Sequence, residues 1–219
     1  WLFEAQSALR VAREEIDALN VFPVPDGDTG TNLYLTVEAA CGALLKPGDD
    51  LGQAAQRVGR AAIMGARGNS GVIFSAFLRD LVVELANSPE NFARALSQGS
   101  HSAYKAVANP LEGTILTVAS RSAQEASNVA AQGADLIEVV SAAAETAYAT
   151  LLLTPELLVQ LREAGVVDAG GRGLVVVLDS LVKILTGTQP QRTEHAVQPF
   201  FDFPRIEISN SKENLSVGA

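Results

Sequence analysis

The stretch of sequence that decides the fold is NVFPVPDGDTGTN, residues 20–32. It separates a helical pattern over residues 1–19 from a second helical pattern over residues 30–45. Pro23 and Pro25 restrict the residues that precede them to extended backbone, so the connection is stiff and non-helical. The stretch therefore predicts two helices joined by a rigid arm, which carries more polar groups than a simple turn requires.

The helical pattern continues beyond this arm to about residue 187. Ala and Leu dominate, and apolar residues recur at three- and four-residue spacing, which is typical of amphipathic helices. Because short connections make consecutive helices antiparallel, we predict an all-α, up-and-down antiparallel bundle of eight long helices. The expected helices cover residues 1–19, 30–45, 51–64, 70–86, 88–107, 114–131, 136–153 and 171–187, with a short extra helix that begins at Thr154-Pro155 and ends at Gly165.

Three further connections are chemically unusual. They are GARGNSG at residues 65–71, EGT at residues 112–114 and VDAGGRG at residues 167–173. Together with residues 20–32, they precede alternate long helices, so an antiparallel bundle places all four at one rim. Helix N-termini attract anions, and glycine lets the backbone approach a phosphate group closely. The rim is therefore predicted to bind phosphate groups.

Two carboxylates mark the rigid arm. Asp26 and Asp28 flank Gly27, so their charges lie within a few ångströms and repel each other unless a cation lies between them. Mg²⁺ takes one or two carboxylates together with phosphate oxygens and water, so the pair suits a magnesium site. The alternative is that both side chains cap the helix that follows. The three other unusual connections favour the metal site.

The composition of the chain excludes several classes of function and of metal site. The chain has 219 residues, of which 47% are hydrophobic, so it can bury a core. Its net charge of −9 argues against a nucleic-acid partner. One cysteine, Cys41, and two histidines exclude an internal disulfide, a Cys-rich zinc site and a multi-His metal site. No apolar run approaches 18 residues and no secretory signal pattern opens the sequence, so we expect a cytoplasmic chain without a membrane span.

The character of the sequence changes at Thr188. Three prolines break any helix after this residue, and Phe200, Phe201 and Phe203 crowd into four positions. We interpret residues 188–219 as a linker or the start of a following domain, and residues 1–187 as one helical domain. A tail folded back on the surface of this same domain is the alternative.

The four connections closely resemble those of a known family. LNVFPVPDGDTGTN at residues 19–32, GARGNSG, EGTIL at residues 112–116 and VDAGGRGL at residues 167–174 resemble the N-terminal kinase domain of bacterial fatty acid kinase. That domain is similar to the nucleotide-binding L domain of dihydroxyacetone kinases. The resemblance covers about residues 1–187 and implies an eight-helix barrel with ATP or ADP and two Mg²⁺ ions at one rim.

The resemblance also implies roles for individual residues. Asp26 and Asp28 correspond to metal ligands and to the catalytic acidic residues. Asn20 stands nearest to a third metal ligand, which is an Asp in the dihydroxyacetone kinases. Those kinases have a His at the position of Thr29, which disfavours dihydroxyacetone as the acceptor. The positions implied to contact the nucleotide are Thr29, Asn32, Gly68, Asn69, Ser70, Gly71, Thr114, Asp168, Ala169 and Gly170.

The implied activity is phosphoryl transfer from Mg·ATP to a fatty acid carboxylate, which gives an acyl phosphate. In the fatty acid kinases a separate DegV-type protein presents the fatty acid, and the full-length chain is compatible with a homodimer. No general base is evident at the rim apart from the metal-binding carboxylates, and an ionised carboxylate acceptor needs none. Two alternatives stay open, namely a dihydroxyacetone-type kinase L domain and a non-catalytic nucleotide-sensing adaptor.

Overall fold

The computed structural model describes residues 1–44, 50–84 and 88–192. Within these ranges the secondary structure consists of α-helices and contains no strand, which confirms the predicted all-α class. The helices are α1 (Leu2–Ala18), α2 (Thr29–Leu44), α3 (Leu51–Gly65), α4 (Gly68–Glu84), α5 (Pro89–Lys105), α6 (Ile115–Ala131), α7 (Leu136–Leu157), α8 (Val159–Ala164) and α9 (Ala169–Thr186).

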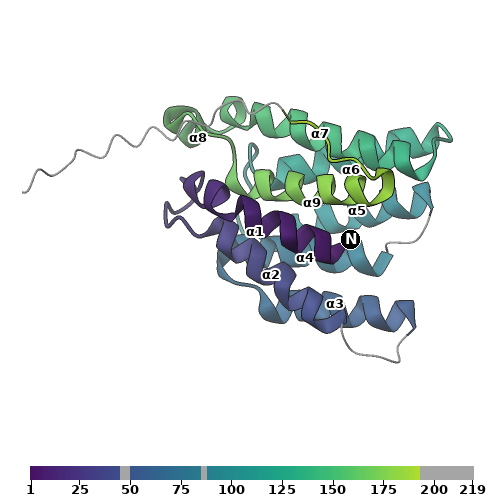
Figure 1. Ribbon diagram of the computed structural model, residues 1–219. Coiled ribbons are helices and arrows are strands. Elements are labelled where there is room, and N and C mark those ends of the chain that lie inside the picture. The colour runs from purple at the N-terminus through teal and green to yellow at the C-terminus, as the bar shows by residue number, and fades with distance from the viewer. Residues whose placement is uncertain (45–49, 85–87, 193–219) are drawn as a thin grey trace, which may run out of the picture.

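The eight long helices form a closed antiparallel ring. Each helix from α1 to α7 packs against the next one, α9 packs against α7, and α9 also packs against α1. The contact between α9 and α1 closes the barrel, which confirms the predicted up-and-down arrangement. The short α8 packs on α7. Figure 1 shows α8 and the connection between α1 and α2 at the same end of the barrel.

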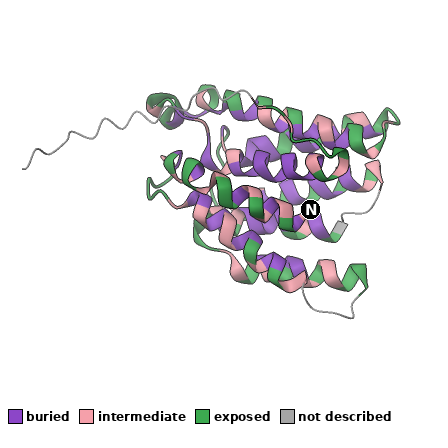
Figure 2. Cartoon of the chain, viewed as in Figure 1, coloured by how far each residue is buried: buried purple, intermediate pink, exposed green. Residues whose placement is uncertain are grey.

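The core is built from small and branched side chains with a few aromatic rings. The rings of Phe74 and Phe77 stack with their centroids 6.2 Å apart, and both side chains are fully buried. Twelve of the 18 residues of α9 are buried, so this helix is a central element rather than a cover. Figure 2 shows the buried positions turned toward the inside of the barrel. Dense packing of this kind holds the helix ends at the rim in fixed positions.

The prediction for the segment around Pro155 is wrong. Thr154 and Pro155 do not begin a short helix, because α7 continues through them to Leu157. Proline lacks the N–H that would bond to the carbonyl of Leu151, four residues earlier. The Thr154 hydroxyl donates to that carbonyl instead, at 2.7 Å, so the helix tolerates the proline. The short helix α8 follows, and Gly165 ends it in the left-handed conformation, as predicted.

The start of the predicted linker returns to the barrel. Arg192 donates two hydrogen bonds to the buried carboxylate of Asp179 in α9, at 2.5 and 3.0 Å. It also pairs with Glu145 at 2.7 Å and lies over the ring of Tyr148, both in α7. The chain therefore contacts this domain again at Arg192. Phe200, Phe201 and Phe203 lie outside the described residues, and the domain boundary at residue 187 stays a prediction.

One described helix has the length and apolar character of a membrane span. It is α7, with 22 residues and a mean hydropathy of 1.5 over its most apolar window. This character is not evident as a continuous apolar run in the sequence, because its apolar residues are interspersed with small and polar ones. Helices in protein cores often have the same character, and α7 packs against both α6 and α9.

Candidate nucleotide and metal site

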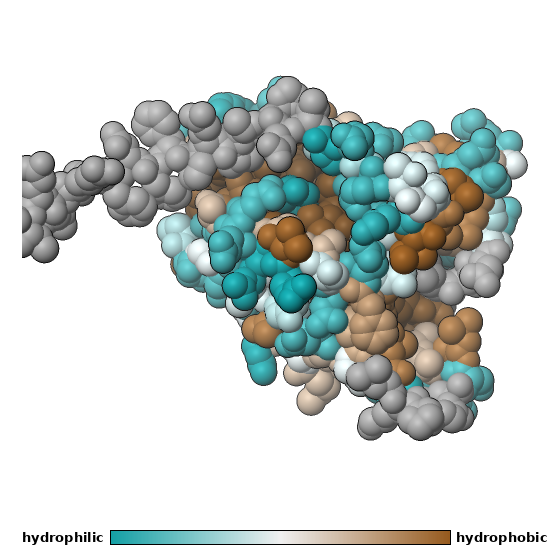
Figure 3. Space-filling model, viewed as in Figure 1, coloured by the Kyte–Doolittle hydropathy of each residue, from teal (hydrophilic) through white to brown (hydrophobic). Residues whose placement is uncertain are grey.

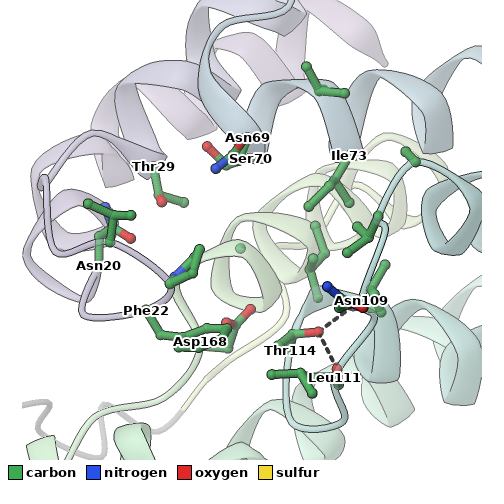
Figure 4. Close-up of a pocket in the computed structure, with 18 of the residues that line it drawn as sticks. Asn20, Phe22, Thr29, Asn69, Ser70, Ile73, Asn109, Leu111, Thr114 and Asp168 are labelled. Atoms are coloured by element: carbon green, nitrogen blue, oxygen red, sulfur yellow. Dashed lines mark hydrogen bonds between the residues drawn. The ribbon is translucent and has the colours of Figure 1, made fainter.

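A cavity of about 430 Å³ lies at the rim where the four unusual connections meet. Residues from all four connections line it, as the antiparallel topology predicts. In Figure 4, Asn69 and Ser70 lie in the upper part of the view, and Asp168 and Thr114 lie below them. The predicted site residues that line the cavity are Asn20, Asp26, Asp28, Thr29, Asn69, Ser70, Thr114, Asp168 and Gly170.

The rigid arm between α1 and α2 brings an amide and two carboxylates to this cavity. Asn20 is buried, and its Nδ2 donates a hydrogen bond to Oδ1 of Asp26 at 2.5 Å. Asp26 is exposed and Asp28 is half-buried. The peptide bond between Phe22 and Pro23 is cis. Within the described ranges, the Asp28 carboxylate forms no hydrogen bond or ion pair.

The N-terminus of α2 is capped by a different residue, Asp17 at the end of α1. Its Oδ1 accepts the backbone N–H of Thr31 at 3.0 Å, and its Oδ2 accepts the Thr31 hydroxyl at 2.8 Å. The alternative role of Asp26 and Asp28 as caps of this helix therefore lacks support. Sequence reasoning missed Asp17, because its partner is 14 residues away and no local motif connects the two.

The donor set of the arm fits Mg²⁺. Oxygen atoms of Asp26 and Asp28 remain available at the cavity, and the Asn20 amide lies beside them. In the described part of the chain, no group of three or more His, Cys, Asp or Glu side chains could hold a metal ion. Two carboxylates alone do not complete a metal shell, but Mg²⁺ commonly completes its shell with phosphate oxygens and water. The arm therefore suits a metal ion that binds together with a phosphate-bearing ligand.

The N-terminus of α4 contributes Asn69 and Ser70 to the cavity, whereas its glycines have a packing role. Gly68 adopts a left-handed backbone with φ +58, and a Cβ atom there would lie 2.3 Å from Nδ2 of Asn32. That buried Nδ2 has no hydrogen-bond partner among the described residues. A Cβ atom on Gly71 would lie 2.9 Å from the Thr36 hydroxyl. Gly71 and Asn32 are buried and Gly68 is exposed, and none of the three lines the cavity.

The N-termini of α6 and α9 form another side of the cavity. The hydroxyl of Thr114 accepts the N–H of Leu116 at 3.3 Å and so caps α6. Asp168 caps α9, because its Oδ2 accepts the N–H of Gly171 at 2.7 Å. Burial raises the pKa of Asp168 to about 6, although hydrogen bonds from the N–H groups of Gly171 and Ile115 oppose the shift. The predicted contact Ala169 is buried and does not line the cavity.

Sequence reasoning missed an apolar wall of the cavity. The connection between α5 and α6 contributes Val107 and Leu111, and α4 contributes Ile73. In the sequence, Asn109-Pro110 predicted only the end of a helix. The available signal was the length of this connection, which carries small apolar residues beyond the helix end. The lining therefore combines the polar groups of the arm with apolar side chains of this connection and of α4.

Two arginines near the rim do not line the cavity. Arg172 forms a two-pronged ion pair with Glu15 of α1, with N–O distances of 2.8 and 3.2 Å. Arg67 lies exposed in the connection between α3 and α4. The glutamate pairing gives Arg172 a structural partner, so this residue ties α9 to α1 instead of offering its charge to the cavity.

The family model of the DAK2 domain matches residues 23–183, which is most of the chain. The chain belongs to the DAK2 family. This DAK2 domain is 45% identical over 193 residues to protein YloV of Bacillus subtilis, and the alignment covers 85% of the chain and 34% of that relative. It is 40% identical to the uncharacterized protein SH1689 of Staphylococcus haemolyticus, over 86% of the chain and 36% of the relative.

The fold of this DAK2 domain also matches a solved structure. The dihydroxyacetone kinase from C. freundii, in complex with AMP-PNP and Mg²⁺, superposes with a TM-score of 0.62 and 21% sequence identity. The match covers 84% of the chain and 33% of that kinase. The chain therefore spans about a third of the length of these relatives, and the likeness to the kinase concerns the fold.

Proposed function

We propose that this DAK2 domain binds Mg·ATP in the rim cavity and transfers the terminal phosphoryl group to an acceptor. One observation carries the proposal. Asp26 and Asp28 stand together at a cavity that is bounded by helix N-termini, and another residue, Asp17, performs the capping that would otherwise explain them. The similarity of the fold to a kinase that binds AMP-PNP and Mg²⁺ supports the same reading.

Each part of the cavity suits one part of the nucleotide. Asp26 and Asp28, with Asn20 beside them, would hold two Mg²⁺ ions, which neutralise phosphate charge during transfer. Asn69 and Ser70, at the N-terminus of α4, would contact phosphate oxygens. The apolar wall at Val107 and Leu111 offers a surface for the base. The polar and apolar parts of the lining thus suit the phosphates and the base of a nucleoside triphosphate.

For the acceptor, we propose a fatty acid carboxylate that a DegV-type protein presents at the rim. Among the described residues that line the cavity, the titratable side chains are Asp26, Asp28 and Asp168, and no His or Lys accompanies them. A carboxylic acid with a pKa of about 4.3 is ionised at neutral pH and attacks without a general base. The product would be an acyl phosphate.

The DAK2 family match and the similarity of the fold to dihydroxyacetone kinase favour a second candidate. This candidate is an L-type domain that phosphorylates dihydroxyacetone bound on another subunit. Thr29, which lines the cavity, offers a hydroxyl where those kinases have a His. A phosphotransfer assay with radiolabelled ATP separates the two candidates. It should compare a lipid-loaded DegV-type protein with free and subunit-bound dihydroxyacetone, using the full-length chain. Nucleotide binding without transfer to either acceptor would identify a nucleotide-sensing adaptor.

The metal-dependent part of the proposal has a direct test. We expect Asp28→Asn to lower the affinity for Mg·ADP at least about tenfold, because it removes one charge that faces the metal. The fold should be unaffected, since the carboxylate makes no hydrogen bond with the described residues. Calorimetry measures the affinity, and thermal melting without metal measures the fold.

Asp50→Asn is the matched control for this substitution. Asp50 is an exposed aspartate that caps α3 through the N–H of Gln53, and it does not line the cavity. Its variant should bind Mg·ADP as the wild type does. Unchanged Mg·ADP affinity in Asp28→Asn would remove the metal assignment, whatever the acceptor is.

A further inference from the structure

The connection between α5 and α6 forms a large part of the apolar wall but has little structure of its own. Its residues before Glu112 that line the cavity are Ala106, Val107, Ala108, Asn109 and Leu111. All of these except Val107 are exposed, so burial does little to hold them in place. Within the described part of the chain, the backbone of residues 108–112 forms no hydrogen bond with another backbone group. The position of the wall therefore depends on side-chain contacts.

Glu112 makes two such contacts, one with each flanking helix. Its Oε2 accepts the hydroxyl of Thr117 in α6 at 2.7 Å, and its Oε1 accepts the hydroxyl of Tyr104 in α5 at 3.2 Å. The Thr117 side chain is buried, and its hydroxyl accepts the N–H of Gly113 at 2.9 Å. Glu112 itself does not line the cavity. Its carboxylate therefore joins the last turn of α5 to the first turn of α6 across the connection.

The residues that follow Glu112 are held by contacts of their own. Gly113 has a left-handed backbone with φ +82, and a Cβ atom there would lie 2.9 Å from Cβ of Leu158, which precedes α8. The Thr114 hydroxyl donates to the carbonyl of Leu111 at 2.9 Å, a bond that Figure 4 shows. These contacts fix the end of the connection next to α6. Glu112 is then the residue whose side chain ties this fixed end back to α5.

We propose that Glu112 is a positioning residue, whose carboxylate holds the wall of residues 106–111 where the base of the nucleotide packs. The inference rests on the proposed nucleotide-binding function of the cavity. A carboxylate has two acceptor oxygens, so it serves both hydroxyls at once, and hydrogen bonds to an ionised acceptor are stronger than neutral ones. The groups proposed for Mg²⁺ and for phosphate lie on the arm and on α4 instead. Loss of the Glu112 carboxylate should therefore weaken recognition of the base and spare that of the phosphates.

Glu112→Ala tests the proposal with two ligands, Mg·ADP and Mg·tripolyphosphate, of which only the first has a base. We expect the variant to bind Mg·ADP about tenfold more weakly than the wild type, because the protein must then order the wall as the base binds. The affinity for Mg·tripolyphosphate should not change. Calorimetry measures both affinities. A merely structural role would lower the two affinities together, so the ratio between them is the decisive quantity.

Glu112→Gln tests whether the two hydrogen bonds matter. Its amide keeps one acceptor oxygen for the Thr117 hydroxyl and one donor for the Tyr104 oxygen, so it should restore most of the Mg·ADP affinity that Glu112→Ala loses. If Glu112→Ala fails to fold in a thermal melt, Tyr104→Phe replaces it. That variant removes the bond to α5 and leaves the one to Thr117.

Glu38→Ala is the matched control. Glu38 is exposed on α2 and accepts the hydroxyl of Tyr34 at 2.6 Å, so it makes the same kind of contact as Glu112 does with Tyr104. It does not line the cavity. Its variant should bind both ligands as the wild type does.

The outcomes separate this inference from the proposed function. Equal Mg·ADP affinities of the wild type and Glu112→Ala, or equal losses for both ligands, overturn the positioning role and leave the nucleotide site intact. A wild type that binds Mg·ADP but no Mg·tripolyphosphate also overturns it, because phosphates and base are then not recognised separately. A wild type that binds no Mg·ADP overturns the proposed function, and the inference falls with it.

Discussion

Gly68 illustrates how a single residue constrains the rim. Its φ of +58 lies in the left-handed region, and a Cβ atom would lie 2.3 Å from the Asn32 amide. A left-handed conformation costs a non-glycine residue about 1–2 kcal/mol. We therefore expect Gly68→Ala to lower the free energy of unfolding by about 2 kcal/mol, because the contact with Asn32 adds to this strain. Urea denaturation measures the change.

Gly42→Ala is the control for this substitution. Gly42 lies on the exposed face of α2, and a Cβ atom there would meet nothing within 4 Å. Alanine in a helix interior is more stable than glycine by about 0.5–1 kcal/mol, so this variant should gain stability. If both variants shift the urea midpoint in the same direction, the conformation assigned to Gly68 is wrong.

Individual residues at the rim also show which contacts could be predicted from the sequence and which could not. The sequence led us to expect Asp26 and Asp28 near one another, because they flank Gly27 in one stiff connection, and the resemblance to the kinase family added Asn20 to this pair. It did not reveal Asp17 as the cap of α2, since the partner lies far along the chain. It also did not distinguish Asn69, which lines the cavity, from Asn32, which is buried and does not line it. Such distinctions depend on which face of a helix meets its neighbour.

Among the elements, α7 depends on an unusual hydroxyl. Thr154 donates to the carbonyl of Leu151, which Pro155 leaves without its helical partner, and accepts the N–H of Asp168. Thr154→Val keeps the shape but leaves both buried backbone groups without partners. We expect a loss of about 2 kcal/mol in the free energy of unfolding, since a buried unsatisfied group costs about 1–3 kcal/mol. Thermal and urea denaturation measure it.

Thr154→Ser provides the comparison, because it keeps the hydroxyl and removes only a methyl group. It should retain most of the stability that Thr154→Val loses. The opposite ranking, with valine more stable than serine at this position, would show that burial of the methyl group matters more than the two hydrogen bonds.

Most helix boundaries could be predicted, because caps and glycines mark them locally. Ser88-Pro89 begins α5, and Asp135 with Glu138 forms the predicted capping box of α7. The α7 segment at Pro155 could not be predicted, since proline is a strong local signal for a helix boundary. A single side-chain hydrogen bond overrides that signal here. The connection between α5 and α6 was likewise read as a helix end, although its side chains form the apolar wall.

For the whole molecule, antiparallel alternation was enough to predict that four distant connections meet at one rim. The shape of the cavity between them was not predictable, because it depends on how closely α6 and α9 approach. Figure 3 shows hydrophilic residues over much of the described surface on one face of the molecule, with scattered apolar groups between them. Such a mixed surface does not by itself indicate where a partner binds.

Because α1 packs against α9, every long helix of the barrel has a neighbour on each side, although the chain is linear. Trp1 donates to the carbonyl of Val177, and Lys183 pairs with Glu4, so α1 and α9 hold each other. A helix with few buried contacts opens easily, and its amides then exchange with deuterium quickly. Here release of α1 or α9 opens the ring, so the buried amides of α1 around Leu9 should exchange as slowly as those of α9 around Val177. Mass spectrometry of deuterium uptake measures both, and fast exchange confined to α1 would show that the ring opens without cost to the remaining helices.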